Sequence, residues 1–244
     1  MGVLLMRLAG PMQSWGTQSR FTVRDSGSEP SKSGVVGLLC AACGIKRDDI
    51  SRIAELASLK MGVRVDREGV RMADFQTAGG GTWPGRKVYG VWKSSGTAGD
   101  TVTSTRHYLA DADFLVALEG PEELLCGLDE ALARPVWPLY LGRKGYVPGI
   151  PVRIPDGLRE GDAESALRSY PWRRRFEKEK VPARLRLVLE SNPRDGQPRA
   201  DVPVSFDSAD RKFKVRYVKV EWMDTSNLPV ADWGVRPCLF TFLD

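Results

Sequence analysis

Apolar positions in the first quarter of the chain predict a buried strand followed by two helices. Residues 3–8 form a short apolar run that is typical of a buried strand. Ser33 is suited to cap a helix with an apolar body, and Gly44 is suited to end it. After Asp48 or Asp49, apolar residues recur at i, i+3 and i+4, which predicts a second helix.

The next stretch has alternating apolar and polar residues and is followed by a glycine-rich segment. Residues 61–65 and 70–72 alternate between apolar and polar positions, and Glu68-Gly69 between them predicts a hairpin. From residue 76 to residue 108 the chain is rich in glycine. A structureless insert of roughly 30 residues is uncommon inside a compact domain, so this stretch predicts a projecting hairpin or a functional loop.

Strands and helices continue in the second half. A strand at 114–118 is followed by a helix from Pro121 to Ala133. The later pattern predicts strands at 150–154, 183–190, 202–206 and 213–221, and a short helix at 161–170. The order fits an α+β fold with a ferredoxin-like or RRM-like βαββαβ domain better than a doubly wound sheet. We expect that domain at 1–150 and a smaller, mostly β region at 151–244.

Composition excludes several classes of protein. Hydrophobic residues make up 42% of the 244 positions and charged residues 27%, so wholesale disorder is excluded. No apolar run approaches the ~18 residues of a membrane span, and we expect a cytoplasmic protein. Cys40 and Cys43 lie inside an apolar helix without a second cysteine pair, which favours core packing over a zinc or redox site. We expect neither a metal nor another cofactor.

The distribution of charge points towards nucleic acid. The net charge is +5, and arginine, whose planar fork suits phosphate, outnumbers lysine 25 to 11. Residues 1–47 and 168–186 are strongly basic, whereas 111–130 contains seven acids and no base. Such segregation is typical of a nucleic-acid-binding protein. A set of solvated faces is the alternative.

Two glycine-containing segments are candidates for phosphate binding. Residues 141–149 combine two glycines, two cations and Tyr146, which a single strand's phosphates and bases can use; a tight connection is the alternative. This segment lacks the spacing of a nucleotide-binding P-loop. The Lys32-Ser33-Gly34 segment opens a helix, whose free N–H groups attract phosphate; ordinary capping explains it as well.

Two further segments have open interpretations. His107 is the single histidine, and with Arg106 and Tyr108 it could serve a metal-independent ribonuclease, or it could be an RNA-contacting or structural histidine. Residues 173–175, three arginines beside Trp172 and Phe176, could form a basic surface for nucleic acid or for an acidic partner. A solvated loop is the alternative there.

Several motifs together resemble a known family. They are residues 8–16 (LAGPMQSWG), 30–39 (PSKSGVVGLL), 44–49 (GIKRDD), 106–112 (RHYLADA), 114–118 (FLVAL) and 141–144 (LGRK). This set resembles the CasD, or "Cas five", family of type I-E CRISPR Cascade subunits. The resemblance covers roughly residues 3 to 150 and includes no motif beyond them.

The resemblance implies an RRM-like protein of the RAMP superfamily with a projecting β-hairpin thumb at about 76–107. Members are non-catalytic subunits in antiviral defence. They hold the 5′ handle of the crRNA, cap the filament of CasC backbone subunits, contact the CasA large subunit and meet target DNA through the guide duplex. Cleavage of pre-crRNA in type I-E belongs to CasE, whereas the type I-C Cas five protein is itself the nuclease. His107 departs from the type I-E pattern and keeps a nuclease as the alternative function.

The motifs and the resemblance together give a set of expected contact residues. Those expected to bind RNA are Trp15, Arg20, Arg24, Lys32, Ser33, Gly34, Arg106, His107, Gly142, Arg143, Lys144 and Tyr146. Those expected on the thumb are Trp83, Arg86, Lys87, Tyr89, Trp92 and Lys93.

Overall fold

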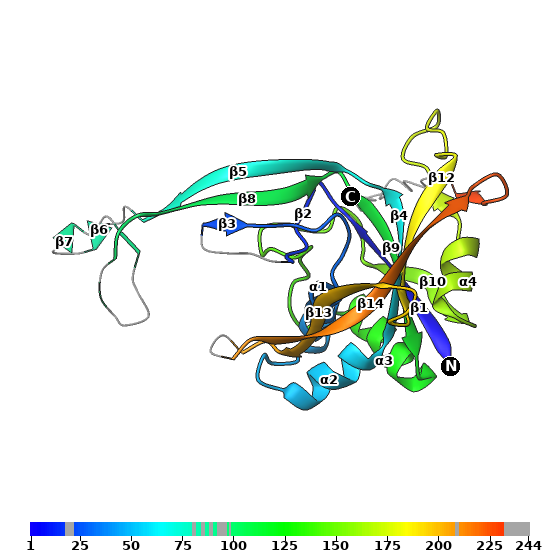
Figure 1. Cartoon of the computed structure of the whole chain (residues 1–244), viewed down its shortest axis with the longest axis horizontal. Coiled ribbons are helices and arrows are strands. Elements are labelled where there is room, and N and C mark those ends of the chain that lie inside the picture. The colour runs from blue at the N-terminus through cyan, green and yellow to red at the C-terminus, as the bar shows by residue number, and fades with distance from the viewer. Residues whose placement is uncertain are drawn as a thin grey trace, which may run out of the picture.

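A seven-stranded sheet organises the chain (Figure 1). The computed structural model describes residues 1–17, 22–79, 82–83, 86–87, 90–91, 97, 99–207 and 210–231. Every pairing within this sheet is antiparallel. In spatial order its strands are β10 (Arg153–Glu160), β1 (Gly2–Ala9), β9 (Asp113–Gly120), β4 (Lys60–Arg67), β12 (Arg184–Ser191), β14 (Lys212–Asp224) and β13 (Gln197–Ser205).

Helices cover both faces of this sheet. On one face α1 (Lys32–Cys43), α2 (Ile50–Ser58) and α3 (Glu122–Ala133) pack over a core that includes Leu4 and Met6. On the other face α4 (Ala163–Ser169) packs over a second core that includes Val3 and Leu5. Because side chains alternate along a strand and both faces of β1 are covered, β1 is apolar on both faces, as its sequence predicts, except at the buried Arg7.

The helices begin and end at residues of the predicted types, except that the residue that caps α1 lies two positions earlier than expected. Ser31, not Ser33, caps α1, and its side chain accepts a hydrogen bond from the amide of Gly34. Gly44 ends α1 in the left-handed conformation at φ 69°, as predicted. Asp49 caps α2 by accepting from the amide of Arg52.

A long two-stranded arm leaves the sheet, as Figure 1 shows. Its strands are β5 (Val70–Ala78) and β8 (Val102–Ala110), with β6 (Thr82–Trp83) and β7 (Arg86–Lys87) at the far end. Short strands β2 (Met12–Gln13) and β3 (Val23–Arg24) pair with β8 near its base. The projecting hairpin is therefore confirmed, and its strands begin at residue 70, before the expected residue 76.

The hairpin predicted at Glu68-Gly69 is wrong. Strand β5 pairs with β8, and β4 pairs with β9 and β12. Gly69 has φ 70°, and a Cβ there would lie 2.6 Å from the carbonyl oxygen of Ala110. The glycine thus directs the chain out of the main sheet and into the arm.

The α+β class is confirmed, but residue 150 does not divide the sheet. Strand β10 lies after that position and pairs with β1, while β12 pairs with β4. Residues after 150 therefore complete the sheet that earlier residues begin. A small parallel sheet of β11 (Trp172–Arg173) and β15 (Val230–Ala231) lies outside it. In the described part of the chain, every helix is too short or too polar to cross a bilayer.

Candidate nucleic-acid interface

A groove of about 490 Å³ opens where three segments meet. These are one side of α1 from Ser33 to Ala41, the connection from α1 to α2, and the segment 137–144, with the connection from β13 to β14 closing one side. The groove is lined by Ser33, Gly34, Gly37, Leu38, Cys40, Ala41, Ile45, Lys46, Arg47, Trp137, Pro138, Tyr140, Gly142, Lys144, Phe206 and Arg211. It brings together the two segments that the sequence singled out for phosphate binding.

The lining is basic and aromatic. Its cations are Lys46, Arg47, Lys144 and Arg211, all exposed, and none of the described residues that line it is acidic. Trp137, with 43% of its surface exposed, adds an aromatic face, as do Tyr140 and Phe206. Cations that follow a backbone and aromatic faces that stack bases are the combination by which proteins bind single-stranded nucleic acid.

The start of α1 corrects the expectation for Lys32 and Gly34. The amide of Lys32 donates to Asp201 at 2.8 Å, and its ammonium is buried against Glu190 at 2.8 Å. The amide of Gly34 donates to Ser31 at 3.3 Å. Burial lowers the pKa of Lys32, an effect that the Glu190 carboxylate partly offsets. Protein groups therefore already bind the amides of Lys32 and Gly34 and the Lys32 ammonium, and of residues 32–34 only Ser33 and Gly34 line the groove.

Trp15 is not a stacking platform. Its side chain is fully buried, and Nε1 donates to Gln13 at 3.2 Å. A Cβ on Gly34 would lie 2.8 Å from Cε3 of the Trp15 ring. The glycine thus permits close packing of α1 on an indole, rather than close approach of a ligand, and the prediction that Trp15 stacks on a base is wrong.

In the loop 141–146, two of the expected contact residues bind the protein itself. Arg143 donates to the Tyr146 hydroxyl at 3.0 Å and to the carbonyl of Arg24 at 3.1 Å. Tyr146 is only 8% exposed, and its ring lies 6.0 Å from that of Tyr108, so it offers no free face to a base. The expectation of base stacking on Tyr146 is therefore wrong. Lys144 stays exposed and lines the groove.

Backbone conformation and close packing against Ser14 require glycine at position 142. Its φ is 92°, and a Cβ there would lie 1.8 Å from the carbonyl oxygen of Ser14. The amide of Ser14 donates to the carbonyl of Leu141 at 3.0 Å. The glycine therefore lets two segments more than 100 residues apart in sequence touch, and the groove forms beside that contact.

His107 does not join its neighbours in one cluster. It lies on β8 between Arg106 and Tyr108, and successive side chains of a strand point to opposite faces. Arg106 donates to Ser104 at 3.1 Å, on its own face of the strand. The arrangement expected of a ribonuclease, with a base and a cation side by side, is therefore not formed by these residues.

Neither a metal site among the described residues nor a reactive thiol at Cys40 is supported by the structure. Among them, no group of three or more His, Cys, Asp or Glu side chains is placed to hold a metal ion. Burial raises the pKa of Cys40 to about 12, so its thiol stays protonated. Cys40 packs in the core, as its place in an apolar helix predicted.

Several expected contacts lie on or near the arm. Arg24 is exposed on β3, beside Arg106 of β8. The side chains of Trp83, Arg86 and Lys87 on β6 and β7 are outside the described part of the structure. Also outside the described residues are Arg20, Tyr89, Trp92 and Lys93.

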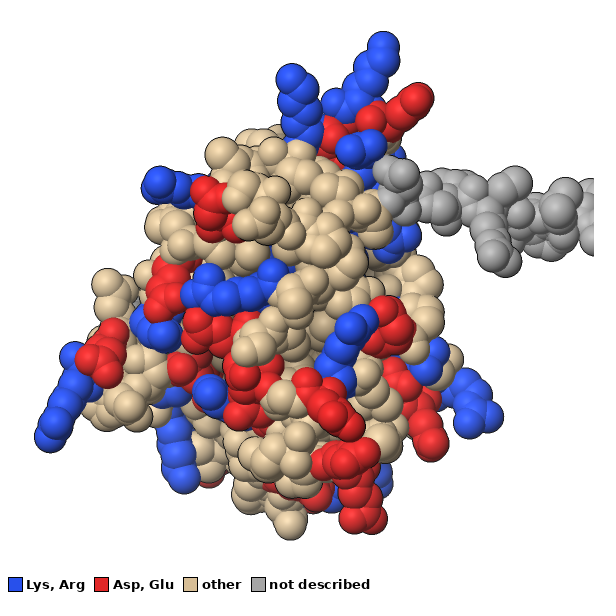
Figure 2. Space-filling view, turned by 90° about the vertical axis from the view of Figure 1, so that its right-hand side faces the viewer, with Lys and Arg blue, Asp and Glu red and all other residues tan. Residues whose placement is uncertain are grey.

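The face that carries α4 differs from the groove in its charge. Figure 2 shows acidic and basic side chains side by side on it. Arg168 lies between Glu164 at 2.7 Å and Glu221 at 2.6 Å, and Lys219 contacts Glu221 at 2.7 Å. Because its charges neutralise one another, this face lacks the unbroken positive surface that a phosphate backbone needs.

Sequence reasoning missed most of the groove. Lys46 and Arg47 were present as a basic pair directly after the helix stop at Gly44, and Trp137 stood between two prolines. Those signals could have marked exposed contact residues. Phe206 and Arg211 gave no comparable signal, because only the folding of β13 and β14 onto the sheet brings them to α1.

Comparison with known proteins places the chain in a family. A family model described as CRISPR-associated protein (Cas_Cas5) matches residues 3–219. The CRISPR system Cascade subunit CasD of Escherichia coli (strain K12) is 36% identical over an alignment of 181 residues, and the match covers 68% of this chain and 76% of that protein.

Two solved structures resemble most of the chain. One, described as the crystal structure of a Cas protein, is 41% identical, covers 94% of this chain and 98% of its own, and has a TM-score of 0.72. The other, from a CRISPR RNA-guided surveillance complex, is 39% identical, covers 92% of this chain and 90% of its own, and has a TM-score of 0.73. The chain belongs to the Cas5 family of CRISPR-associated proteins.

Proposed function

We propose that the chain is a non-catalytic subunit of a type I-E CRISPR Cascade surveillance complex and that its groove holds the 5′ handle of the crRNA. Two similarities support the assignment: CasD of E. coli is a Cascade subunit, and one structural neighbour comes from an RNA-guided surveillance complex. The complex serves antiviral defence in the cytoplasm.

The observation that carries the proposal is the composition of the groove. Four cations from three segments line it together with three aromatic residues, and no described acidic residue does. An RNA end recognised as a single strand needs phosphate contacts and aromatic faces in one place.

The same proposal assigns the remaining partners. One end of the chain's own fold caps the filament of CasC subunits, another surface contacts the CasA large subunit, and the arm lies over the guide where it pairs with target DNA. We infer further that β1, α1, β4, β9, α3 and β10 form a ferredoxin-like unit, since the strand order β10-β1-β9-β4 is antiparallel throughout.

A salt titration tests the groove. In the full chain, Lys46→Gln with Lys144→Gln removes two exposed groove cations. Binding of a labelled repeat-derived RNA, measured by fluorescence anisotropy, should weaken, and the slope of log K against log salt should flatten by roughly 1.4, at ~0.7 for each lost single-strand contact.

The matched control removes the same charge elsewhere. Lys178 and Lys180 are exposed and lie outside the groove, so Lys178→Gln with Lys180→Gln should leave the slope as in the wild type. Trp137→Ala should weaken binding by about 1–3 kcal/mol, the range for loss of one stacked base, at an unchanged slope. If the groove variant and the control behave alike, the handle does not bind in this groove.

A further inference from the structure

Two residues with left-handed backbone join the arm to the sheet. Gly69, at φ 70°, lies between β4 and β5, and Asp111, at φ 61°, lies between β8 and β9. Asp111 is the single described residue other than glycine with a positive φ. The two connections are adjacent, because Val70 pairs with Ala110. The direction in which the arm leaves the sheet therefore depends on these two backbone conformations.

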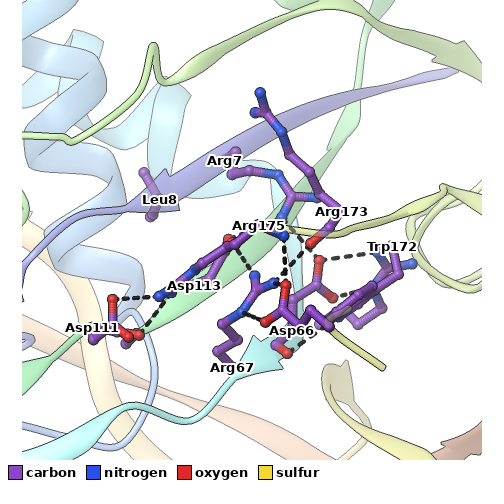
Figure 3. Close-up of polar contacts among 12 residues, drawn as sticks. Arg7, Leu8, Asp66, Arg67, Asp111, Asp113, Trp172, Arg173 and Arg175 are labelled. Atoms are coloured by element: carbon purple, nitrogen blue, oxygen red, sulfur yellow. Dashed lines mark hydrogen bonds and ion pairs between the residues drawn. The ribbon is translucent and has the colours of Figure 1, made fainter. Parts of the chain in front are cut away.

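Arg175 binds Asp111 in two ways, as Figure 3 shows. Its Nη1 donates to the Asp111 carboxylate at 2.5 Å, and its Nη2 donates to the Asp111 carbonyl oxygen at 3.0 Å. One guanidinium thus fixes both the side chain and the backbone of the same residue. The left-handed conformation costs a residue with a side chain about 1–2 kcal/mol, and these contacts help to offset it.

Arg175 is itself held in place by a second arginine. The amide of Arg175 donates to Glu179 at 2.5 Å, and Glu179 accepts two further hydrogen bonds from Arg67, at 3.0 and 2.7 Å. Arg67 also donates to the carbonyl of Arg173 at 2.9 Å and lies over the Trp172 ring, 4.7 Å from its centroid. The segment 172–179 is therefore clamped to β4.

A series of alternating arginine and aspartate side chains connects Arg67 to the buried part of the sheet (Figure 3). Arg67 contacts Asp113 at 2.8 Å, Asp113 contacts Arg7 at 2.9 Å, and Arg7 contacts Asp66 at 3.0 Å. Arg64 completes the series with a bond to Asp66 at 2.6 Å. Side chains of Arg7, Arg64, Asp66 and Asp113 are all nearly inaccessible to solvent. A buried ionic series of this kind has little freedom to rearrange, because every broken pair leaves a charge unpaired away from water.

Contacts other than those of Arg175 hold β8 near the base of the arm. Ser14 donates to the carbonyl of His107 at 3.2 Å, and Tyr108 packs on Tyr146. These contacts lie on β8 before Asp111 and do not involve residues 172–179. Strands β2 and β3 also pair with β8, and the amide of Asp111 donates to the carbonyl of Pro11 at 3.1 Å. The base of the arm is thus held at several points, and Arg175 provides one of them.

We propose that the segment 172–179 is a brace that sets the direction of the β5–β8 arm, with Arg175 as the positioning residue. The inference gives Arg175 a role other than the basic contact surface considered from the sequence for residues 173–175. Trp172 is buried, with Nε1 donating to the carbonyl of Asp66 at 3.3 Å, so it anchors the brace and offers no face to a partner.

Pulsed electron paramagnetic resonance on the full chain tests the brace. Spin labels on unnatural amino acids at Thr77 on the arm and Ser51 on α2, both exposed, report the distance between arm and body. Arg175→Ala should at least double the width of the distance distribution. Arg175→Lys and Asp111→Asn should give intermediate widths, because each retains part of the contact.

Arg159 provides a matched control. It binds the side chain of Asp156 at 2.6 Å and the carbonyl of Asp156 at 3.2 Å, the same pair of contacts at a site away from the arm. Arg159→Ala should leave the width unchanged. Equal widths for wild type, Arg175→Ala and Asp111→Asn, or equal broadening by Arg159→Ala, would overturn the proposal. No RNA is present in this measurement, so its outcome tests the brace and does not depend on the proposed function.

Discussion

At the scale of single residues, Glu29 connects the approach to α1 with two distant strands. It is 5% exposed, accepts from Arg186 at 2.8 Å and also contacts Arg199. Burial alone would raise its pKa, but hydrogen bonds from Ser28 and Arg186 and the charge of Arg199 outweigh burial, and the pKa of Glu29 is lowered. The ionised form therefore stabilises the fold.

Acid should remove this stabilisation. A carboxyl whose pKa is depressed on folding contributes stability above its unfolded pKa and loses that contribution as the pH falls through the folded value. Glu29→Gln should lower the free energy of unfolding by about 3 kcal/mol at pH 7, since two arginines lose a buried partner, and the loss should shrink below pH ~4. Urea denaturation between pH 3 and 7 measures both effects.

A surface glutamate supplies the comparison for Glu29. Glu160 is exposed at the end of β10, and Glu160→Gln should change the free energy of unfolding little at any pH. A loss at Glu29→Gln that stays constant down to pH 3 would show that packing, and not charge, accounts for it.

Residue types indicate which side chains could contact RNA, but they do not indicate which of them are exposed. Lys144 and Lys32 were both expected to bind RNA, and Lys144 is exposed whereas Lys32, also in a basic and glycine-containing segment, is buried. The difference arises from Asp201 and Glu190, which lie more than 150 residues further along the chain. Local sequence contains no information on such partners, so burial at these positions could not be predicted from it.

At the scale of elements, helix α1 shows how glycine is used for packing. Gly34 lies in the first turn, against the Trp15 ring. Gly127 lies within α3, where a Cβ would meet nothing within 4 Å. The same substitution in the two helices therefore has opposite expected effects.

Gly34→Ala should destabilise the protein by about 1–3 kcal/mol, because overpacking against a fully buried indole outweighs the gain in helix propensity. Gly127→Ala should stabilise it by roughly 0.5–1 kcal/mol through propensity alone. Both changes are measured by thermal unfolding of the full chain. A stabilised Gly34→Ala would show that Trp15 can move aside.

Elements could be predicted more reliably than their pairing. The caps at Gly44 and Asp49 are local signals, and the structure confirms both. The partner of β5 is not local: alternation between β4 and β5 suited a hairpin, yet the left-handed turn at Gly69 sends β5 to β8. Side-chain alternation states that a segment is a strand and leaves its neighbour open.

At the scale of the whole molecule, the sheet unites the two parts that the sequence seemed to divide at residue 150. The face of β1 and β9 with Val3, Leu5 and Leu115 is covered by α4 and Trp172, all from after that position. Strand β12 also supplies the second neighbour of β4. The first 150 residues alone therefore lack the cover of one entire face.

Two shortened chains test which parts of the molecule the sheet needs in order to fold. A fragment of residues 1–150 should fail to unfold cooperatively in urea and should exchange its amide hydrogens rapidly, because an apolar face is exposed and β1 and β4 each lose one neighbouring strand. Replacing residues 74–106 with a short glycine-serine turn removes mostly exposed positions of β5 and β8, so that chain should keep a cooperative transition close to that of the full protein. Cooperative unfolding of the fragment would mean that β10 and α4 are additions to a self-sufficient domain. Loss of cooperativity in the armless chain would mean that the arm stabilises the sheet from which it projects.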